Sequence, residues 1–437
     1  MKLRQLAALF CSAVLLTACG GGTSGRCDGN DDKSWLCGYM SEWYFWYATS
    51  PTPAPSAYAS LDSYFNALLF QGDATFPADG YSYYEPTASF NQFFGDGETL
   101  GYGLFVAGLE VEGRPDLPLR VRYIEPRSDA AFKGLQRGDE ILLINGVAAS
   151  SYIAQNDFSV LSPENSGESL NLLVRGPGGD RNVTLVANVY ALTPVSTTNI
   201  VTTALGRRMG YILVKDMISQ VDAPLETAFA QFRAQGVTEV VVDLRYNGGG
   251  LVSVGGNIAS YVGGSRSSGQ VYARLLYNDQ RAAFNNQDFR FTNPASALGL
   301  SRVYVLTGAR TCSASEQVIN GLRPFVNVVQ IGDTTCGKPV GFLPTPYQGN
   351  TYSVVNFESV NQLNQGRYFD GLAPNCSLTD DLDHPLGSPD EGLLAAARLH
   401  ADTGACPASA RRAQPLAARA AGRRLVEPGE RQGMLAR

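Results

Sequence analysis

The stretch EVVVDLRYNGGG, at residues 239–250, decides the fold. Its first half is a continuous apolar run rich in β-branched residues, typical of a strand buried on both faces of a sheet. Its second half is a glycine-rich turn, in which backbone N–H groups can approach a ligand closely. The turn matches neither G-x-G-x-x-G nor the phosphate-binding P-loop, so a nucleotide site is not indicated.

Strands and helices alternate on both sides of this stretch. Before it, residues 209–214 predict a strand, and residues 223–235 predict a helix that ends at Gly236. After it, the pattern predicts helices at residues 252–262 and 316–322 and strands at residues 303–307 and 325–331. This order predicts a parallel sheet covered by helices, and we assign residues 195–406 to one α/β domain.

The segment TCSASE, at residues 311–316, begins an apolar helix and offers a serine as a nucleophile. Ser313 followed by Glu316 is also a helix capping box, so a purely structural role is the alternative. A serine nucleophile needs a base, and the chain has only two histidines, both near its C-terminal end. We therefore expect Lys338 as the base, since its neighbours are uncharged and burial can lower the pKa of a lysine.

Residues 98–190 carry two glycine motifs that resemble those of a PDZ domain. GYGLF at residues 101–105 is followed by GLQRGDEILLING at residues 134–146, in which Asn-Gly is a strong hairpin signal. The resemblance implies a bound peptide that adds a strand to the domain, with its terminal carboxylate held by loop amides. The corresponding loop here consists of Gly101, Tyr102, Gly103 and Leu104. The alternative is a PDZ fold that only packs against its neighbour.

These segments together resemble the S41 family of carboxyl-terminal processing peptidases, also called tail-specific proteases. The matching pieces occur in the family's order: the strand at residues 210–212, the DLRYNGGG turn, the SASE segment, and GDTTCGK at residues 332–338. The resemblance covers about residues 35–400. It implies an α/β catalytic domain with a ClpP/crotonase-like βαβ core and an inserted PDZ domain.

The same resemblance assigns roles to individual residues. Ser313 is expected to be the nucleophile and Lys338 the general base, which would act on polypeptide substrates. The backbone amides of Ala314 and Gly249, with Gly248 as the weaker choice, are expected to form the oxyanion hole. Two other nucleophiles remain as alternatives, the Ser315 hydroxyl and the Cys312 thiol.

One position departs from the family pattern. The processing peptidases usually carry a glutamine four residues after the lysine, where this chain has Phe342. Asn361, Gln362 or Asn364 could orient the lysine instead. The departure keeps open a catalytically weak or inactive PDZ peptide-binding or scaffold lipoprotein, and a non-peptidase Ser–Lys amidase or esterase is a further alternative.

The cysteines indicate disulfides in an exported protein. Besides Cys11 and Cys19 in the leader region, six cysteines remain. Proximity along the chain favours the pairs Cys27–Cys37 and Cys376–Cys406, and this leaves Cys312–Cys336, which would join the two catalytic segments. A metal site is the rival interpretation, but no CxxC pair or histidine cluster supports it, and no metal or organic cofactor is implied.

Residues 1–18 have the features of a lipoprotein signal peptide, a short positive region followed by an apolar run. Leu16-Thr17-Ala18-Cys19 resembles the lipoprotein box, which implies a lipid anchor at Cys19, and the following glycine resembles sorting to the outer membrane. We therefore expect a bacterial envelope lipoprotein that faces the periplasm. The net charge of −6, without a basic stripe, argues against a nucleic-acid partner.

Three further segments complete the expected domain organisation. Residues 19–32 are glycine-rich at their start and predict a flexible tether. Residues 33–97 are rich in aromatic residues at helical spacing and predict an N-terminal helical region. Residues 407–437 are rich in alanine and arginine and predict a disordered basic tail.

Overall fold

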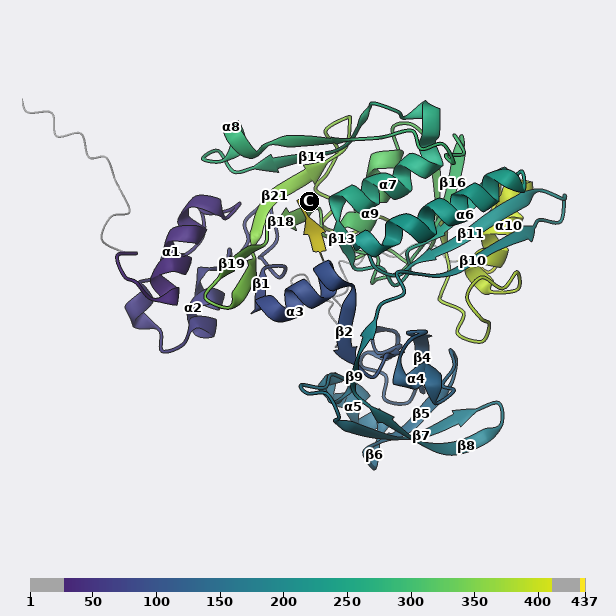
Figure 1. Ribbon diagram of the computed structural model, residues 1–437, viewed down its shortest axis with the longest axis horizontal. Coiled ribbons are helices and arrows are strands. Elements are labelled where there is room, and N and C mark those ends of the chain that lie inside the picture. The colour runs from purple at the N-terminus through teal and green to yellow at the C-terminus, as the bar shows by residue number, and fades with distance from the viewer. Residues whose placement is uncertain (1–26, 411–432, 437) are drawn as a thin grey trace, which may run out of the picture.

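The computed structural model describes residues 27–410 and 433–436 (Figure 1). Its centre is a six-stranded sheet in the order β10-β11-β12-β16-β17-β22. The last five strands run parallel to their neighbours, and β10 is antiparallel to β11. The parallel sheet predicted from the sequence is therefore present. The strands are β10 (Val195–Thr202), β11 (Arg208–Val214), β12 (Glu239–Asp243), β16 (Arg302–Thr307), β17 (Asn327–Gly332) and β22 (Cys376–Ser377).

Helices cover both faces of this sheet, which explains the continuous apolar run of β12. Val240 and Val242 belong to the core on the side of α6, α7 and α9, whereas Val241 belongs to the core on the side of α10. A strand between two cores has no face left for polar residues. The helices are α6 (Asp222–Ala234), α7 (Val252–Gly263), α9 (Ala314–Leu322) and α10 (Gly392–Thr403).

A second six-stranded sheet, in the order β13-β23-β18-β21-β14-β15, lies beside the first (Figure 1). It includes the end of the glycine-rich turn in β13 and the residues after Lys338 in β18. The short helix α8 (Ala282–Asn285) connects two of its strands. The strands are β13 (Gly249–Leu251), β14 (Val271–Tyr277), β15 (Gln287–Arg290), β18 (Val340–Phe342), β21 (Val355–Val360) and β23 (Gly433–Leu435).

The prediction of a disordered tail at residues 407–437 is wrong for residues 433–435, which form β23. The physical reason is that Met434 and Leu435 are fully buried in this sheet. Two apolar residues are too short a signal to stand out within an alanine- and arginine-rich segment. Residues 411–432 and 437 lie outside the described residues.

The N-terminal region packs on the second sheet rather than forming a separate body. Its aromatic side chains share one core with Phe342, Tyr352 and Val355 of the catalytic domain. A small sheet in the order β1-β20-β19 joins the two parts. The elements are α1 (Asp32–Trp43), α2 (Leu61–Leu68), β1 (Tyr83–Pro86), α3 (Thr87–Asn91), β19 (Thr345–Tyr347) and β20 (Asn350–Ser353).

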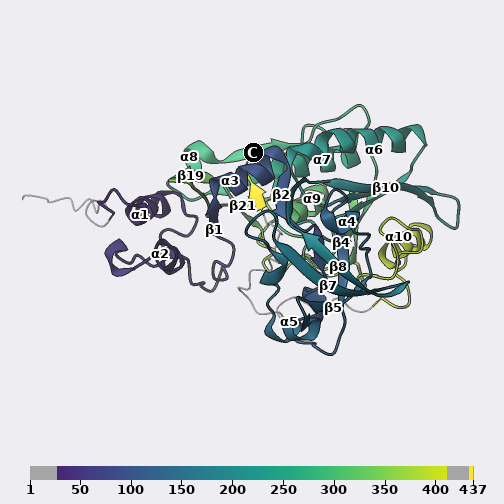
Figure 2. The ribbon, with the colours of Figure 1, turned by 60° about the horizontal axis from the view of Figure 1, so that its bottom comes forward.

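A β-rich unit forms the lower part of Figure 1, and it comes forward in Figure 2. It has a core of its own and is joined to the rest through β2 and β9, which pair with each other. Its elements are β2 (Glu98–Gly101), β3 (Leu104–Val106), β4 (Leu119–Ile124), α4 (Asp129–Phe132), β5 (Glu140–Ile144), β6 (Val147–Ala148), α5 (Ala149–Gln155), β7 (Ser169–Gly176), β8 (Gly179–Val186) and β9 (Asn188–Ala191).

All three predicted disulfides, Cys27–Cys37, Cys312–Cys336 and Cys376–Cys406, are present. The predicted lipidation residue, Cys19, lies outside the described residues. Within residues 27–410 and 433–436, no helix combines the length and the apolar character needed to cross a membrane.

Candidate active site

Ser313 lies in the tight turn between β16 and α9. Its backbone has φ 63° and ψ −117°, a conformation that non-glycine residues rarely adopt. The residue is fully buried, and its Oγ makes no hydrogen bond within the part of the chain that the structure describes. Strained turns of this kind persist only where the surroundings hold them, and they cluster at active sites. The fold therefore holds the Ser313 hydroxyl in a strained and buried turn at the start of α9.

Lys338 lies between β17 and β18 and is 1% exposed. Its Nζ is 4.0 Å from the ring centroid of Phe342 and 5.8 Å from that of Tyr81. The Tyr81 hydroxyl donates a hydrogen bond to the carbonyl oxygen of Gly337, at 2.9 Å. The expected burial of this lysine is therefore present, and two aromatic rings form part of its surroundings.

Glu316 joins the serine segment to the lysine segment. Its Oε2 accepts hydrogen bonds from the amides of Ser313 and Lys338, both at 2.8 Å. Its Oε1 accepts from the amide of Gly337 at 2.8 Å and from the Thr335 hydroxyl at 2.5 Å. Burial raises the pKa of this carboxyl above its usual value, and the four donors oppose that rise.

Sequence reasoning identified Glu316 only as part of a capping box. Its hydrogen bond to the Ser313 amide confirms that part of the prediction. The bonds to residues 335–338 were missed, because nothing in the local pattern shows which distant loop faces a capping residue.

The disulfide Cys312–Cys336 makes a second, covalent link between the same two segments. The amide of Cys336 also donates to the carbonyl oxygen of Thr311, at 3.0 Å. Because both sulfurs are bonded to each other, Cys312 is not a free thiol, and this contradicts its alternative role as nucleophile. The two sulfurs and Glu316 lie close together, but a disulfide does not supply the thiolates that a metal centre would need.

The glycine-rich turn is held against the serine segment by Asn247. Its Oδ1 accepts hydrogen bonds from the amide of Gly249 and from the Ser315 hydroxyl, both at 2.8 Å. Its carbonyl oxygen accepts from the amide of Cys312 at 3.1 Å. Ser315 therefore has a structural role here, unlike the unpaired hydroxyl of Ser313.

Gly249 must be a glycine at this place. Its φ is 99°, and a Cβ there would lie 2.9 Å from the amide nitrogen of Ala314 and 2.9 Å from the carbonyl oxygen of Cys312. The turn thus packs closely against the start of α9, next to the amide of Ala314. The amide of Gly249 itself, however, is engaged by Asn247, so one of the two expected donors already has a partner.

Comparisons with known proteins agree with this arrangement. The profile of "Peptidase family S41" matches residues 208–377, and that of "Peptidase S41 N-terminal domain" matches residues 31–83. The chain belongs to peptidase family S41. The S41 domain thus contains the two candidate catalytic residues, Ser313 and Lys338, and the glycine-rich turn.

Individual relatives are distant in sequence. The carboxyl-terminal-processing protease of a Picosynechococcus species is 26% identical over 238 residues, which cover 53% of each chain. The chloroplastic C-terminal processing peptidase of Tetradesmus obliquus is 26% identical over 244 residues, covering 53% of this chain and 50% of that one. The chain therefore spans about half the length of the curated relatives that it matches.

Solved structures share the fold over a larger part of the chain. A Bacteroides fragilis protein described as an S41 protease is 26% identical, with a TM-score of 0.66, and the match covers 83% of this chain and 96% of that one. The photosystem II D1 C-terminal processing protease is 18% identical with a TM-score of 0.50, covering 79% and 92%, and this likeness concerns the fold alone.

The three residues suggested as replacements for the family's glutamine each make hydrogen bonds to residues other than Lys338. Asn361 contacts Asn320, Gln362 accepts from the amide of Val271, and Asn364 accepts from an arginine side chain. The position of the glutamine is instead occupied by the ring of Phe342, against which the lysine amine lies. In this S41 domain an aromatic face therefore lies beside the amine of Lys338, at the position where the family pattern has a glutamine.

The predicted peptide-binding loop lines a cavity of about 320 Å³ that the β-rich unit shares with Ser89 and Gln92 of the N-terminal region. Gly101, Tyr102, Gly103 and Leu104 all contribute to it, together with residues 161–164. Gly103 has φ 75°, and a Cβ there would overlap the Ser128 side chain at 1.9 Å, so the loop requires glycine.

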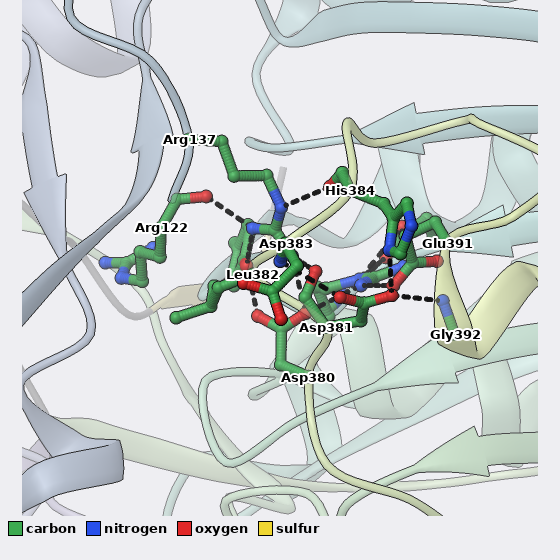
Figure 3. Close-up of polar contacts among 12 residues, drawn as sticks. Arg122, Arg137, Asp380, Asp381, Leu382, Asp383, His384, Glu391 and Gly392 are labelled. Atoms are coloured by element: carbon green, nitrogen blue, oxygen red, sulfur yellow. Dashed lines mark hydrogen bonds and ion pairs between the residues drawn. The ribbon is translucent and has the colours of Figure 1, made fainter. Parts of the chain in front are cut away.

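An ion-pair network connects the β-rich unit to the S41 domain (Figure 3). Arg137 of the β-rich unit donates to Asp380 Oδ1 at 2.7 Å and to the carbonyl oxygens of Asp381 and His384 at 2.8 and 3.1 Å. Asp380 also accepts from Arg245 at 2.8 Å. Burial by itself would raise the pKa of the Asp380 carboxyl, but the two arginines outweigh it and hold that pKa well below its usual range.

This network reaches the glycine-rich turn directly. Arg245 precedes the turn and is also held by Glu391 at 2.6 Å and by Asp243 at 2.8 Å. Tyr246 donates to Asp380 and accepts from Arg137. Both residues stand immediately before Asn247, which holds the turn. The network therefore ends at the backbone next to the candidate oxyanion hole.

A second buried carboxyl lies at the same junction. Glu125 at the end of β4 is 1% exposed, and its Oε1 accepts from the amide of Thr193 at 3.3 Å. Burial, together with the charge of Asp216 in the S41 domain, raises the pKa of Glu125 to about 7. The junction thus contains a group that titrates near neutral pH.

Proposed function

We propose that this chain is an endopeptidase in which Ser313 attacks the peptide carbonyl while Lys338 takes its proton. The observation that carries the proposal is the Glu316 carboxylate, which binds the amides of both residues at once. Two segments far apart in sequence are thereby held together around a strained, buried serine with an unused hydroxyl. A structural capping box alone would need neither the lysine segment nor the strain.

The steps follow from general acid–base and nucleophilic chemistry. The neutral amine of Lys338 would accept the hydroxyl proton as Ser313 Oγ bonds to the carbonyl carbon. The amide of Ala314, at the start of α9, would donate to the developing oxyanion. Because Gly249 already donates to Asn247, we assign the second donor to Gly248. Lys338 would then protonate the leaving amine, and water would release the acyl group.

The expected substrates are unfolded or C-terminally recognised envelope polypeptides. We propose that the β-rich unit is a PDZ domain that binds the C-terminal end of such a chain. The support is the cavity of about 320 Å³ that its Gly101–Leu104 loop lines. We also propose the expected export, with a lipid anchor at Cys19 that would hold the enzyme at the outer membrane, facing the periplasm.

One observation favours a second candidate function. Phe342 stands where the family has its lysine-orienting glutamine, and the lysine amine lies against its ring at 4.0 Å. A ring face attracts the charged form of an amine, whereas a base must be neutral. A weak or inactive enzyme that serves as a peptide-binding scaffold is consistent with this contact.

The test is digestion of an unfolded polypeptide by the chain from residue 26 onward. The parent should cleave it, whereas Ser313→Ala and Lys338→Ala should not. Ser315→Ala tests the rival nucleophile and should keep measurable cleavage, although it loses the hydrogen bonds that the hydroxyl donates to Asn247. No cleavage by the parent, with retained binding of C-terminal peptides, would favour the scaffold. Hydrolysis of small esters but not of peptides would favour an amidase or esterase.

A further inference from the structure

The C-terminal segment of this chain lies inside the catalytic sheet. β23 occupies the position between β13 and β18 and runs parallel to both (Figure 1, yellow arrow at the C-terminal end). The amide of Gly433 donates to the carbonyl oxygen of Gly248 at 3.1 Å, and the amide of Ala436 donates to the carbonyl oxygen of Phe342 at 3.1 Å. The segment thus bridges the glycine-rich turn and the strand that follows Lys338.

The backbone of the segment is in close contact with both sides. A Cβ at Gly249 would lie 2.2 Å from the carbonyl oxygen of Gly433, and this same position lies 2.9 Å from the amide of Ala314. A Cβ at Gly341 would lie 2.5 Å from the carbonyl oxygen of Met434. The glycines on either side therefore admit a peptide backbone next to the candidate oxyanion hole.

The side chains of the segment are as well accommodated as its backbone. Met434 and Leu435 are both fully buried, Met434 in the core of the S41 domain and Leu435 in the core shared with the N-terminal region. Removal of β23 would leave one edge of β13 and one edge of β18 facing an apolar gap one strand wide. Unpaired edges of this kind bind an extended peptide through its main chain, and the side pockets add specificity.

We propose that residues 433–436 are a tethered occupant of the substrate cleft, which blocks the active site until a substrate displaces them. This inference rests on the proposed function, since it identifies the cleft that a polypeptide substrate would enter. A strand attached to the same chain competes at the high effective concentration of an intramolecular ligand, of the order of mM. Substrates that bring their own extended C-terminal segment would compete for the same two strand edges.

The experiment compares three full chains that differ only in β23. The double variant M434D/L435D places two charges in the buried apolar positions and should release the segment. The swap M434L/L435M keeps both positions apolar and is the matched control. Initial rates of cleavage of an unfolded polypeptide should rise about tenfold in the first variant and change little in the second. A synthetic peptide with the sequence of residues 430–437 should inhibit the first variant.

A second measurement separates this inference from the proposed function. The same peptide, labelled with a fluorophore, is titrated against each chain carrying Ser313→Ala, and its anisotropy reports binding without any catalysis. Binding to the M434D/L435D chain but not to the parent supports occupancy of the cleft even if no chain cleaves polypeptide. Binding to neither chain, or equal cleavage rates in an active parent and M434D/L435D, would overturn the inference. So would Ser313-dependent loss of residues 434–437 from the parent, since a blocking segment must survive.

Discussion

The replacement Glu316→Gln tests whether one carboxylate positions both catalytic segments. Oε2 holds the amides of Ser313 and Lys338, and Oε1 holds the Gly337 amide and the Thr335 hydroxyl. Glutamine has the same shape but only one acceptor oxygen, while its other atom is a donor. The substitution therefore leaves no cavity, and its effect comes from hydrogen bonding alone.

The magnitude follows from where the new NH₂ group must point. It will face the Oε1 side, because the Thr335 hydroxyl can rotate to accept from it, whereas the two amides on the other side cannot. The Gly337 amide is then left buried without an acceptor, at a cost of about 1–3 kcal/mol. Removal of a buried charge offsets part of this, so we expect a net loss of about 1–2 kcal/mol in the free energy of unfolding. The activity should fall much further, by about 100-fold in kcat, since a shift of about 1 Å at a catalytic group costs that much.

The assay combines denaturant unfolding with kcat and KM on an unfolded polypeptide. The matched control is Glu239→Gln, which alters another buried carboxylate, one that pairs with Arg302 at the opposite end of the parallel strands. The control should lose stability but keep its kcat. A Glu316→Gln enzyme with kcat within twofold of the parent would refute the positioning role, whatever its stability. A rise in KM with an unchanged kcat would also contradict this role, because positioning of the reacting groups acts on kcat.

Four further results are expected. Replacement of Cys312 and Cys336 by alanine should lower the free energy of unfolding by about 3 kcal/mol, from the entropy of a loop of 24 residues, and should also lower kcat. Glu125 has a pKa of about 7, above that of an unfolded glutamate, so its protonated form stabilises the fold. This contribution is complete below about pH 4.5 and is lost as the pH rises through 7. In Glu125→Gln, the free energy of unfolding measured across that window should lose up to about 3 kcal/mol of its pH dependence. Asp380→Asn leaves two largely buried arginines without their shared charge and should cost about 3–5 kcal/mol in chemical denaturation. Phe342→Leu removes the ring that favours the charged amine of Lys338, so more of this amine should be neutral, and kcat should rise by up to about tenfold, with KM little changed, in steady-state kinetics.

The sequence predicted the parallel sheet because its evidence is local. The β-branched run at residues 239–243 and the helices on either side of it can be recognised from their composition and from the spacing of their apolar residues. Their prediction therefore did not require knowledge of distant partners. The disulfides followed from separation along the chain. Ser313 and Lys338 were chosen as candidates from a set of motifs at a given spacing. Their common hydrogen-bond partner, Glu316, supports this choice, and no single motif shows that contact.

The features that sequence reasoning missed depend on the path of the backbone within a turn or on contacts between distant segments. The Asn247 side chain accepts a hydrogen bond from the amide of Gly249, although the motif alone suggests that this amide is available to a ligand. The segment at residues 433–435 pairs with strands far earlier in the chain, and three residues give no periodic signal. The residues proposed to replace the missing glutamine, Asn361 among them, could be judged only from where their loop lies.

The departure at Phe342 matters less to the geometry of Lys338 than the motif alone suggests. A glutamine would orient the amine of the lysine through its side chain, which can rotate. Here the backbone of Lys338 is fixed at its own amide by Glu316 and, two residues earlier, by the disulfide at Cys336. The side chain then has few directions left, because it is 1% exposed and its amine lies against the Phe342 ring. The position of Lys338 is thus set by the same group that holds Ser313. A loss of the glutamine therefore removes one hydrogen bond to the amine but leaves the distance between the two segments under the control of Glu316.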